Sequence, residues 1–294
     1  MFRCLLGRTV VALLACSTPA LALDCTPTAD AVDPRCYGAY ADGVHDDGAA
    51  LQQAINAAVA EEKPLHLVHA HFVTLRPLTI DYGQGPLQGR EGFLLQSDDA
   101  TIDGTRAGQA NVLTLWCAGG TPTSPKGCFY FHQTGTLFVN GQTPYWVLVV
   151  GEGNFSDAQN SIIFDHVVVN NSGNGGGTIL DYVLSSHLNI VSDTAGNSPG
   201  LAMMQVQMST IQLAASSVGN AALQIWTYYN FGDVIETPDL EASPVCVDAM
   251  GGHSHDVTIT GGTIDCAAAF IDPGHVLLPS GYNIGGAVKA GSQP

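Results

Sequence analysis

Polar residues recur at a constant interval in the second half of the chain, as His187, Thr210, Asp233 and Asp256. If this interval is one turn of a repeating structure, the four side chains form one outward column, with Asp233 and Asp256 about 5 Å apart on adjacent turns. Two carboxyl groups this close do not ionise independently. Their spacing suits either the catalytic pair of a retaining glycosidase or two oxygen ligands of calcium. A solvated or turn-capping aspartate column is the structural alternative.

A histidine cluster adjoins this column. Residues 251–256 read Gly-Gly-His-Ser-His-Asp, which places His255 directly before Asp256. A histidine beside a carboxylate can move protons to and from a substrate. We therefore expect acid–base catalysis by Asp233 and Asp256, with His255 or His187 assisting. A polar turn without a catalytic role is the alternative interpretation of the cluster.

Aromatic residues stand near these candidates. Trp226 and Tyr228 lie within the repeating half, and Trp146 lies in an earlier stretch that is expected to protrude as a loop. Flat aromatic side chains offer large contact areas at low entropic cost and stack well on sugar rings. These three residues, together with Thr210, are the predicted substrate contacts, and stacking within the fold is the alternative.

The same interval predicts the elements that position these residues. Apolar residues repeat in two columns, the second interrupted at Glu236: Leu188, Ile211, Val234 and Val257, then Ile190, Leu213 and Ile259. Short alternating segments between Gly, Asn and Ser predict half-buried strands. Turns of about 22 residues with short strands are typical of a single-stranded right-handed parallel β-helix. We expect an all-β protein of roughly ten such coils, most regular over residues 161–266.

The N-terminal part of the mature chain predicts one helix. Asp46 or Asp47 can accept a hydrogen bond from the free N–H groups of a first helical turn. Apolar residues then repeat at helical spacing, at Leu51, Ala54, Ile55 and Ala58. No second helix of comparable quality follows, so this helix is expected to cap one end of the strands. We place the cap at residues 37–60.

Residues 37–55 carry the pattern Tyr-Gly-Ala-x-x-Asp-Gly-x-x-Asp-Asp-x-x-Ala-Leu-Gln-x-Ala-Ile, which resembles the opening of pectate lyase superfamily proteins. That superfamily includes pectin lyase-like enzymes, family 28 glycoside hydrolases and phage tailspikes. The resemblance implies a right-handed parallel β-helix and a protein that acts on polysaccharide, although this fold hosts several chemistries. The Gly-His-Gly segment of family 28 is not matched, because Ser254 replaces the second glycine and no Arg-x-Lys follows. Polygalacturonase activity is therefore not implied.

The first residues predict export. Residues 1–22 combine Arg3 and Arg8 with an apolar core and a small-residue cleavage site, as a secretory signal does. Cys16 after Leu-Leu-Ala leaves a lipoprotein signal as the alternative. Residues 23–294 are then expected to form one secreted domain, extracellular or periplasmic, with no membrane span. We expect a monomer.

Six cysteines remain after the predicted signal, and an even number in an exported chain predicts disulfides. Fifteen pairings are possible, and the spacing favours three local ones: Cys25 with Cys36, Cys117 with Cys128, and Cys246 with Cys266.

Charge narrows the choice of partner. The chain carries a net charge of −17, and no Lys or Arg lies between Lys126 and Lys289. Nucleic acid is excluded as a partner, because phosphate binding needs a basic surface. A bare polyuronate is disfavoured, since arginine and lysine are the usual carboxylate ligands. The sequence therefore predicts carboxylate-catalysed hydrolysis of a neutral or calcium-bridged polysaccharide. A calcium-dependent lyase with calcium at Asp233 and Asp256, and a non-catalytic glycan-binding or cell-envelope solenoid, are the alternatives.

Overall fold

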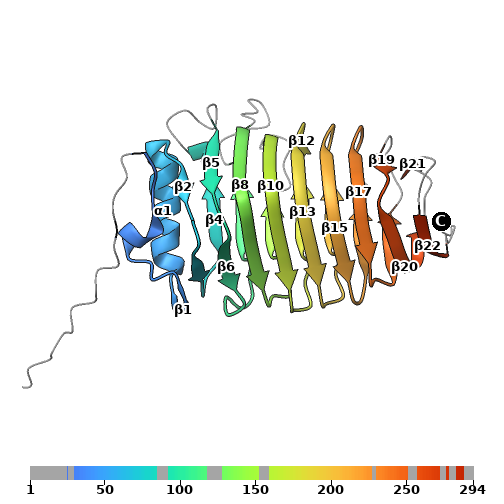
Figure 1. Ribbon diagram of the computed structural model, residues 1–294, viewed down its shortest axis with the longest axis horizontal. Helices are drawn as coiled ribbons and strands as arrows, with labels where there is room; N and C mark the ends of the chain where they lie inside the picture. The colour runs from blue at the N-terminus through green and yellow to red at the C-terminus, as the bar shows by residue number, and fades with distance from the viewer. Residues whose placement is uncertain are drawn as a thin grey trace, which may run out of the picture.

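The computed structural model describes residues 25, 30–84, 92–117, 128–151, 159–226, 230–250, 257–271, 276–277 and 283–287. Within these residues, one 22-stranded sheet is parallel at every strand pairing. The sheet winds into a parallel β-helix, which confirms the predicted fold class. The coils follow one another along the long axis, from helix α1 at one end to strand β22 at the other (Figure 1). The predicted signal at residues 1–22 lies outside the described residues.

Two long faces make up most of the β-helix. Face 1 consists of β1 (Asp42–Asp46), β2 (Leu65–His66), β3 (His71–Val73), β5 (Phe93–Gln96), β6 (Ala100–Gly104), β8 (Cys128–Gly141), β10 (Gln159–Asn171), β13 (His187–Thr194), β15 (Thr210–Ser217), β17 (Val234–Glu241), β19 (Val257–Thr260) and β21 (Val276–Leu277). Face 2 consists of β4 (Leu78–Asp81), β7 (Leu113–Trp116), β9 (Leu148–Val150), β11 (Thr178–Asp181), β14 (Leu201–Met204), β16 (Ala221–Ile225) and β18 (Val245–Ala249). Strand β12 (Val183–Leu184) pairs with β10, β20 (Thr263–Ile271) pairs with both β17 and β18, and β22 (Asn283–Ala287) pairs with β20.

Between β13 and β19, the coils of face 1 become longer by one residue toward the C-terminus. Leu188 pairs with Ile211, at the predicted interval, whereas Ile211 pairs with Ile235 and Ile235 with Ile259, each one residue beyond that interval. The predicted continuation of this core column at Val234 is therefore wrong by one residue. Because side chains alternate between the two sides of a strand, the slip puts Val234 outside and Ile235 in the core.

The helix that caps the β-helix agrees with prediction. Helix α1 spans Gly48–Glu61, follows the short 3-10 helix Pro34–Tyr37, and buries the predicted stripe of Leu51, Ala54, Ile55 and Ala58. Asp46 accepts a hydrogen bond from the Gly48 N–H at 3.0 Å. Asp47 instead accepts the N–H groups of Tyr40 and Ala41, at 2.6 and 3.1 Å, and so anchors the loop before the helix. Burial raises the pKa of the Asp47 carboxyl, against the effect of these donors. A second 3-10 helix, Tyr82–Gln84, follows β4.

All three predicted disulfides are confirmed. Cys25–Cys36, Cys117–Cys128 and Cys246–Cys266 have Cα separations of 5.0, 5.9 and 5.4 Å. Three disulfides fit an oxidising environment such as the extracellular space. Among the described residues, no helix combines the length and the apolar character needed to cross a bilayer.

The interior between the faces is apolar and includes an aromatic group. Phe131 is fully buried, with ring centroids 5.7 Å from Phe93, 5.6 Å from Tyr82 and 6.1 Å from Phe164. These rings come from consecutive coils and tie face 1 to the end of β4. A void beside Phe131 measures about 10 Å³, so the described core is closely packed there.

Candidate functional site

Asp233 does not join His187 and Thr210 in an outward column. His187 pairs with Thr210, but Thr210 pairs with Val234, so Asp233 precedes the column by one residue and faces inward. It is 0% exposed. The predicted outward ladder is therefore corrected at this residue, and the cause is the longer coil between β15 and β17.

Asp233 is the last rung of an inner polar ladder. Ser186 accepts the Ile162 N–H at 3.0 Å, Ser209 accepts the Ser186 N–H at 3.2 Å, and Asp233 Oδ1 accepts the Ser209 N–H at 2.9 Å. Asp233 Oδ2 has no hydrogen-bond partner within the described part of the chain. Burial raises the pKa of this carboxyl to about 7, and the Ser209 N–H only partly opposes the shift. A carboxyl group with no exposed surface does not contact an external ligand in this conformation.

Of the other residues predicted for this site, the structure describes His187 and Thr210. His187 is exposed at the start of β13, and Thr210 is half-buried on the next coil of face 1. His255 and Asp256, and the predicted contact Tyr228, lie outside the described residues, so their roles and the proposed calcium stay predictions. Within the described ranges, no group of three or more His, Cys, Asp or Glu residues is arranged to hold a metal ion.

A different outward column brings two carboxylates together. The column runs through consecutive coils of face 1 and ends on β20: Asp103, Asn140, Asn170, Asp193, Ser216, Glu241 and Asp265. Asn170 donates to Asn140 at 3.0 Å, and Ser216 donates to Asp193 at 2.8 Å. Glu241 and Asp265 are both exposed and are direct register partners. Among the described residues, neither carboxylate has a hydrogen-bond or ion-pair partner.

These two carboxylates line an open depression of about 710 Å³, together with Val218, Ser243, Pro244 and Ala267. We call this depression the carboxylate cleft. It lies where the chain turns from β17 to β18 through Ala242, whose φ of 53° is left-handed, and Ser243. The carboxylate cleft is therefore a feature of the turns at this end of the β-helix, and the two strands β17 and β20 present its acidic side chains.

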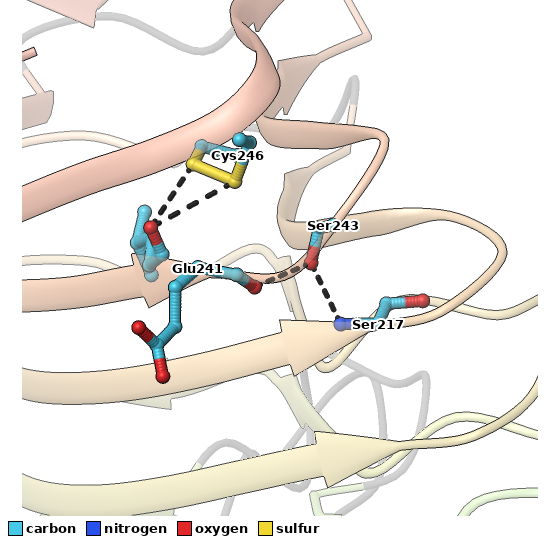
Figure 2. Close-up of a disulfide and its surroundings, with 6 residues drawn as sticks. Ser217, Glu241, Ser243 and Cys246 are labelled. Atoms are coloured by element: carbon cyan, nitrogen blue, oxygen red, sulfur yellow. Dashed lines mark hydrogen bonds between the residues drawn. A yellow bond between two sulfur atoms is a disulfide. The ribbon is translucent and has the colours of Figure 1, made fainter. Parts of the chain in front are cut away.

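The backbone beneath the carboxylate cleft is held from several directions (Figure 2). Ser243 Oγ donates to the Glu241 carbonyl at 3.0 Å and accepts the Ser217 N–H at 2.7 Å. The Cys246–Cys266 disulfide joins β18 to β20, and its two sulfurs contact the Leu240 carbonyl at 3.2 and 3.7 Å. Ser243 is itself buried, so it fixes the turn and is not offered to a ligand.

The arrangement suits acid–base chemistry on a glycosidic bond. Adjacent parallel strands lie about 4.8 Å apart, which is close to the separation of about 5 to 5.5 Å between the carboxyl groups of retaining glycosidases. Glu241 and Asp265 are two carboxylates on adjacent coils, at other positions than the predicted pair of Asp233 and Asp256. The sequence contained a signal for them, since Glu241 and Asp265 have the same separation in the chain as the paired core residues Ile235 and Ile259.

The predicted aromatic contacts Trp146 and Trp226 lie on another surface. Both pack against an apolar cluster of Val149, Ile179 and Ala202. This cluster is separate from the interior and belongs to the outer side of face 2, since the alternating neighbours Leu148, Leu180 and Leu201 are in the core. The structure thus brings two of the predicted contacts together at face 2, whereas the predicted catalytic residue His187 begins β13 on face 1.

Comparison with known proteins finds only distant similarity to solved structures. No family model and no curated protein sequence matches this chain. The ORF18 protein of Geobacillus virus E2 is similar at 15% identity and a TM-score of 0.40, covering 82% of this chain and 42% of that one. The A-module of mannuronan C-5 epimerase AlgE4 from Azotobacter vinelandii is similar at 14% identity and a TM-score of 0.28, covering 90% and 98%. The present chain therefore spans less than half the length of the phage protein.

Proposed function

We propose that this protein is an exported, carbohydrate-active β-helix that hydrolyses glycosidic bonds of an uncharged polysaccharide at the carboxylate cleft. The observation that carries the proposal is the register pairing of Glu241 and Asp265, which are both exposed and whose carboxylates have no hydrogen-bond or ion-pair partner among the described residues. The N-terminal resemblance to the pectate lyase superfamily and the three disulfides support a polysaccharide as the substrate and export as the destination.

The proposed reaction needs two carboxyl groups in different protonation states. One of the pair, protonated, donates its proton to the glycosidic oxygen as that bond breaks, while the other, ionised, attacks the anomeric carbon. Water then hydrolyses the glycosyl-enzyme ester, and the first carboxylate takes the proton of that water. The short distance between adjacent strands favours this two-step route, because it leaves little room for a water between the carboxylates.

The charge around the carboxylate cleft sets the substrate class. The chain has no Lys or Arg between Lys126 and Lys289, so no cation of either type from that long segment can pair with an acidic sugar. Carboxylates repel a polyuronate and accept hydrogen bonds from hydroxyl groups. An uncharged polysaccharide therefore fits the surface better than an acidic one.

The pair is tested by removing one ionisable group at a time. Glu241→Gln and Asp265→Asn should each lower the rate of reducing-end release from a neutral polysaccharide by about 100-fold or more, the usual contribution of a general acid or base. Asp239→Asn is the matched control, because Asp239 is exposed on the same strand but pairs with Thr263. Its rate should stay within about twofold of the wild type.

Two results would contradict this function. Full activity in both Glu241→Gln and Asp265→Asn would remove the pair from catalysis. Unsaturated, ultraviolet-absorbing ends that disappear with a chelator would identify a calcium-dependent lyase instead. A second candidate function, glycan binding without cleavage, is favoured by the openness of the carboxylate cleft, and binding with no product from any neutral polysaccharide would identify it.

A further inference from the structure

The tryptophans of this chain all lie on the outer side of face 2. The sequence contains three, at 116, 146 and 226. Trp116 ends β7 and alternates with the core residue Leu115, Trp146 precedes β9, and Trp226 follows β16. All three side chains are half-buried. We call the outer side of face 2 that carries them the tryptophan face.

Local contacts fix two of the indole rings. The Trp146 ring lies over Gly176 of the next coil, where an added Cβ would be 2.7 Å from the ring atom Cη2, and the backbone N–H of Trp146 donates to Asn111 Oδ1 at 3.1 Å, which anchors the main chain beneath the ring. The Trp226 indole N–H donates to Gln224 Oε1 at 2.7 Å. Rings held in this way lose little conformational entropy when a ligand stacks on them.

Polar groups stand beside the rings. Gln224 Nε2 donates to Asp248 Oδ2 at 3.1 Å, so the amide of Gln224 links the Trp226 indole to a carboxylate on the next coil. The buried Trp116 Nε1 has no hydrogen-bond partner in the described part of the chain. Indole faces with adjacent carboxylate and amide groups match a ligand that has apolar ring faces and hydroxyl edges.

We infer that the tryptophan face is a binding surface for an uncharged polysaccharide chain, separate from the carboxylate cleft. The inference takes its ligand class from the proposed function. Half-buried Asp248 lies on the outer side of this face, and no basic residue occurs in the chain between β9 and β18 other than histidine, so the face offers a polyanion no cation of the Lys or Arg type. The buried apolar cluster of Val149, Ile179 and Ala202 supports Trp146 and Trp226, which both pack against it.

The length of the tryptophan face sets a requirement on the length of the polysaccharide that binds it. Trp116 ends β7 and Trp226 directly follows β16, and these two strands are four pairing steps apart through β9, β11 and β14. At about 4.8 Å per step, the two residues are separated by about 19 Å along the β-helix. A sugar too short to span this distance meets only part of the surface, so affinity should rise with chain length until the span is covered.

Calorimetric titration of the full-length protein with neutral gluco-, xylo- and manno-oligosaccharides of increasing length tests the inference. At least one series should bind with affinity that increases with length and then levels off. Trp226→Ala and Trp146→Ala should each weaken that binding about tenfold or more, as expected for the loss of an aromatic anchor. Trp226→Tyr keeps a stacking ring and should retain part of the affinity. This variant separates the loss of stacking from a disturbance of folding by alanine.

The control and the contrary outcomes separate this inference from the proposed function. Tyr130→Ala removes an exposed aromatic side chain from β8 on face 1 and should leave binding unchanged. Unchanged binding in both tryptophan variants, preference for polygalacturonate, or a dimer that Trp226→Ala dissociates in sedimentation would each overturn the inference.

Glu241→Gln should lose cleavage but keep binding. Loss of binding in the tryptophan variants together with full cleavage in Glu241→Gln would overturn the proposed function alone.

Discussion

Replacing Asp233 by serine should remove a large part of the pH dependence of stability between pH 4 and pH 8. The carboxyl has a pKa of about 7 in the folded protein, against 3.8 as its ordinary value. As pH rises from about 4 to 7, the unfolded chain releases this proton while the folded protein retains it, so the free energy of unfolding falls. At about 1.4 kcal/mol per pKa unit, the loss is about 4 kcal/mol. Above pH 7 the folded carboxyl also ionises and the loss levels off.

The measurement is urea unfolding of both proteins across this range. The hydroxyl of a serine at this position can accept the Ser209 N–H, just as the Ser209 hydroxyl accepts the Ser186 N–H. Asp233→Ser should therefore keep the inner polar ladder intact. The difference in the free energy of unfolding between variant and wild type should move in favour of the variant by about 4 kcal/mol from pH 4 to pH 8. Asp239→Ser, at an exposed aspartate, should show no comparable change. Parallel curves for Asp233→Ser and wild type would contradict the buried, raised-pKa carboxyl.

Replacing Phe131 by alanine should lower the free energy of unfolding by about 4 kcal/mol. Phe131 is fully buried and is surrounded by Phe93, Tyr82 and Phe164 on neighbouring coils. Truncation removes these ring contacts and leaves a cavity that the closely packed core cannot fill by collapse. The same urea titration, followed by circular dichroism, measures the change.

Two further variants serve as references for the loss in the free energy of unfolding expected for Phe131→Ala. Phe131→Leu keeps most of the side-chain volume and should cost less than about 1.5 kcal/mol. Phe138→Ala removes a half-buried ring from the outer side of β8 and should cost clearly less than Phe131→Ala. Equal losses at Phe131 and Phe138 would show that the aromatic group in the core does not contribute as a packed unit.

Local sequence signals were sufficient for much of the fold. The apolar stripe of α1 follows from helical spacing within a few residues, and the disulfides follow from short separations in a chain predicted to be exported. The column of Leu188 and Ile211 was predicted correctly because both residues lie in regular alternating strands. These features depend on contacts close in sequence or on an undisturbed period.

Predicting the residues of the candidate site required the length of each coil to be known to within one residue. A constant period assigned Asp233 to the outside, whereas the step from Ile211 to Ile235 is one residue longer than the step from Leu188 to Ile211. The register shift within β15 and β17, between Gln212 and Ala214, accompanies this change. Since alternate residues face opposite sides, an error of one residue exchanges core and surface. Interruption of the second apolar column at Glu236 marked the place, but a single sequence does not give the size of the slip.

The build of the tryptophan face has a consequence for how its specificity can change. Trp116 and Trp226 are fixed to strands whose separation is a whole number of coils, so their distance can take only values that differ by about 4.8 Å. Insertion or deletion of one complete coil between them would lengthen or shorten the distance from Trp116 to Trp226 by one inter-strand step without altering either ring. Selection for longer or shorter glycans can therefore act through coil duplication and loss, while the chemistry of each contact stays constant.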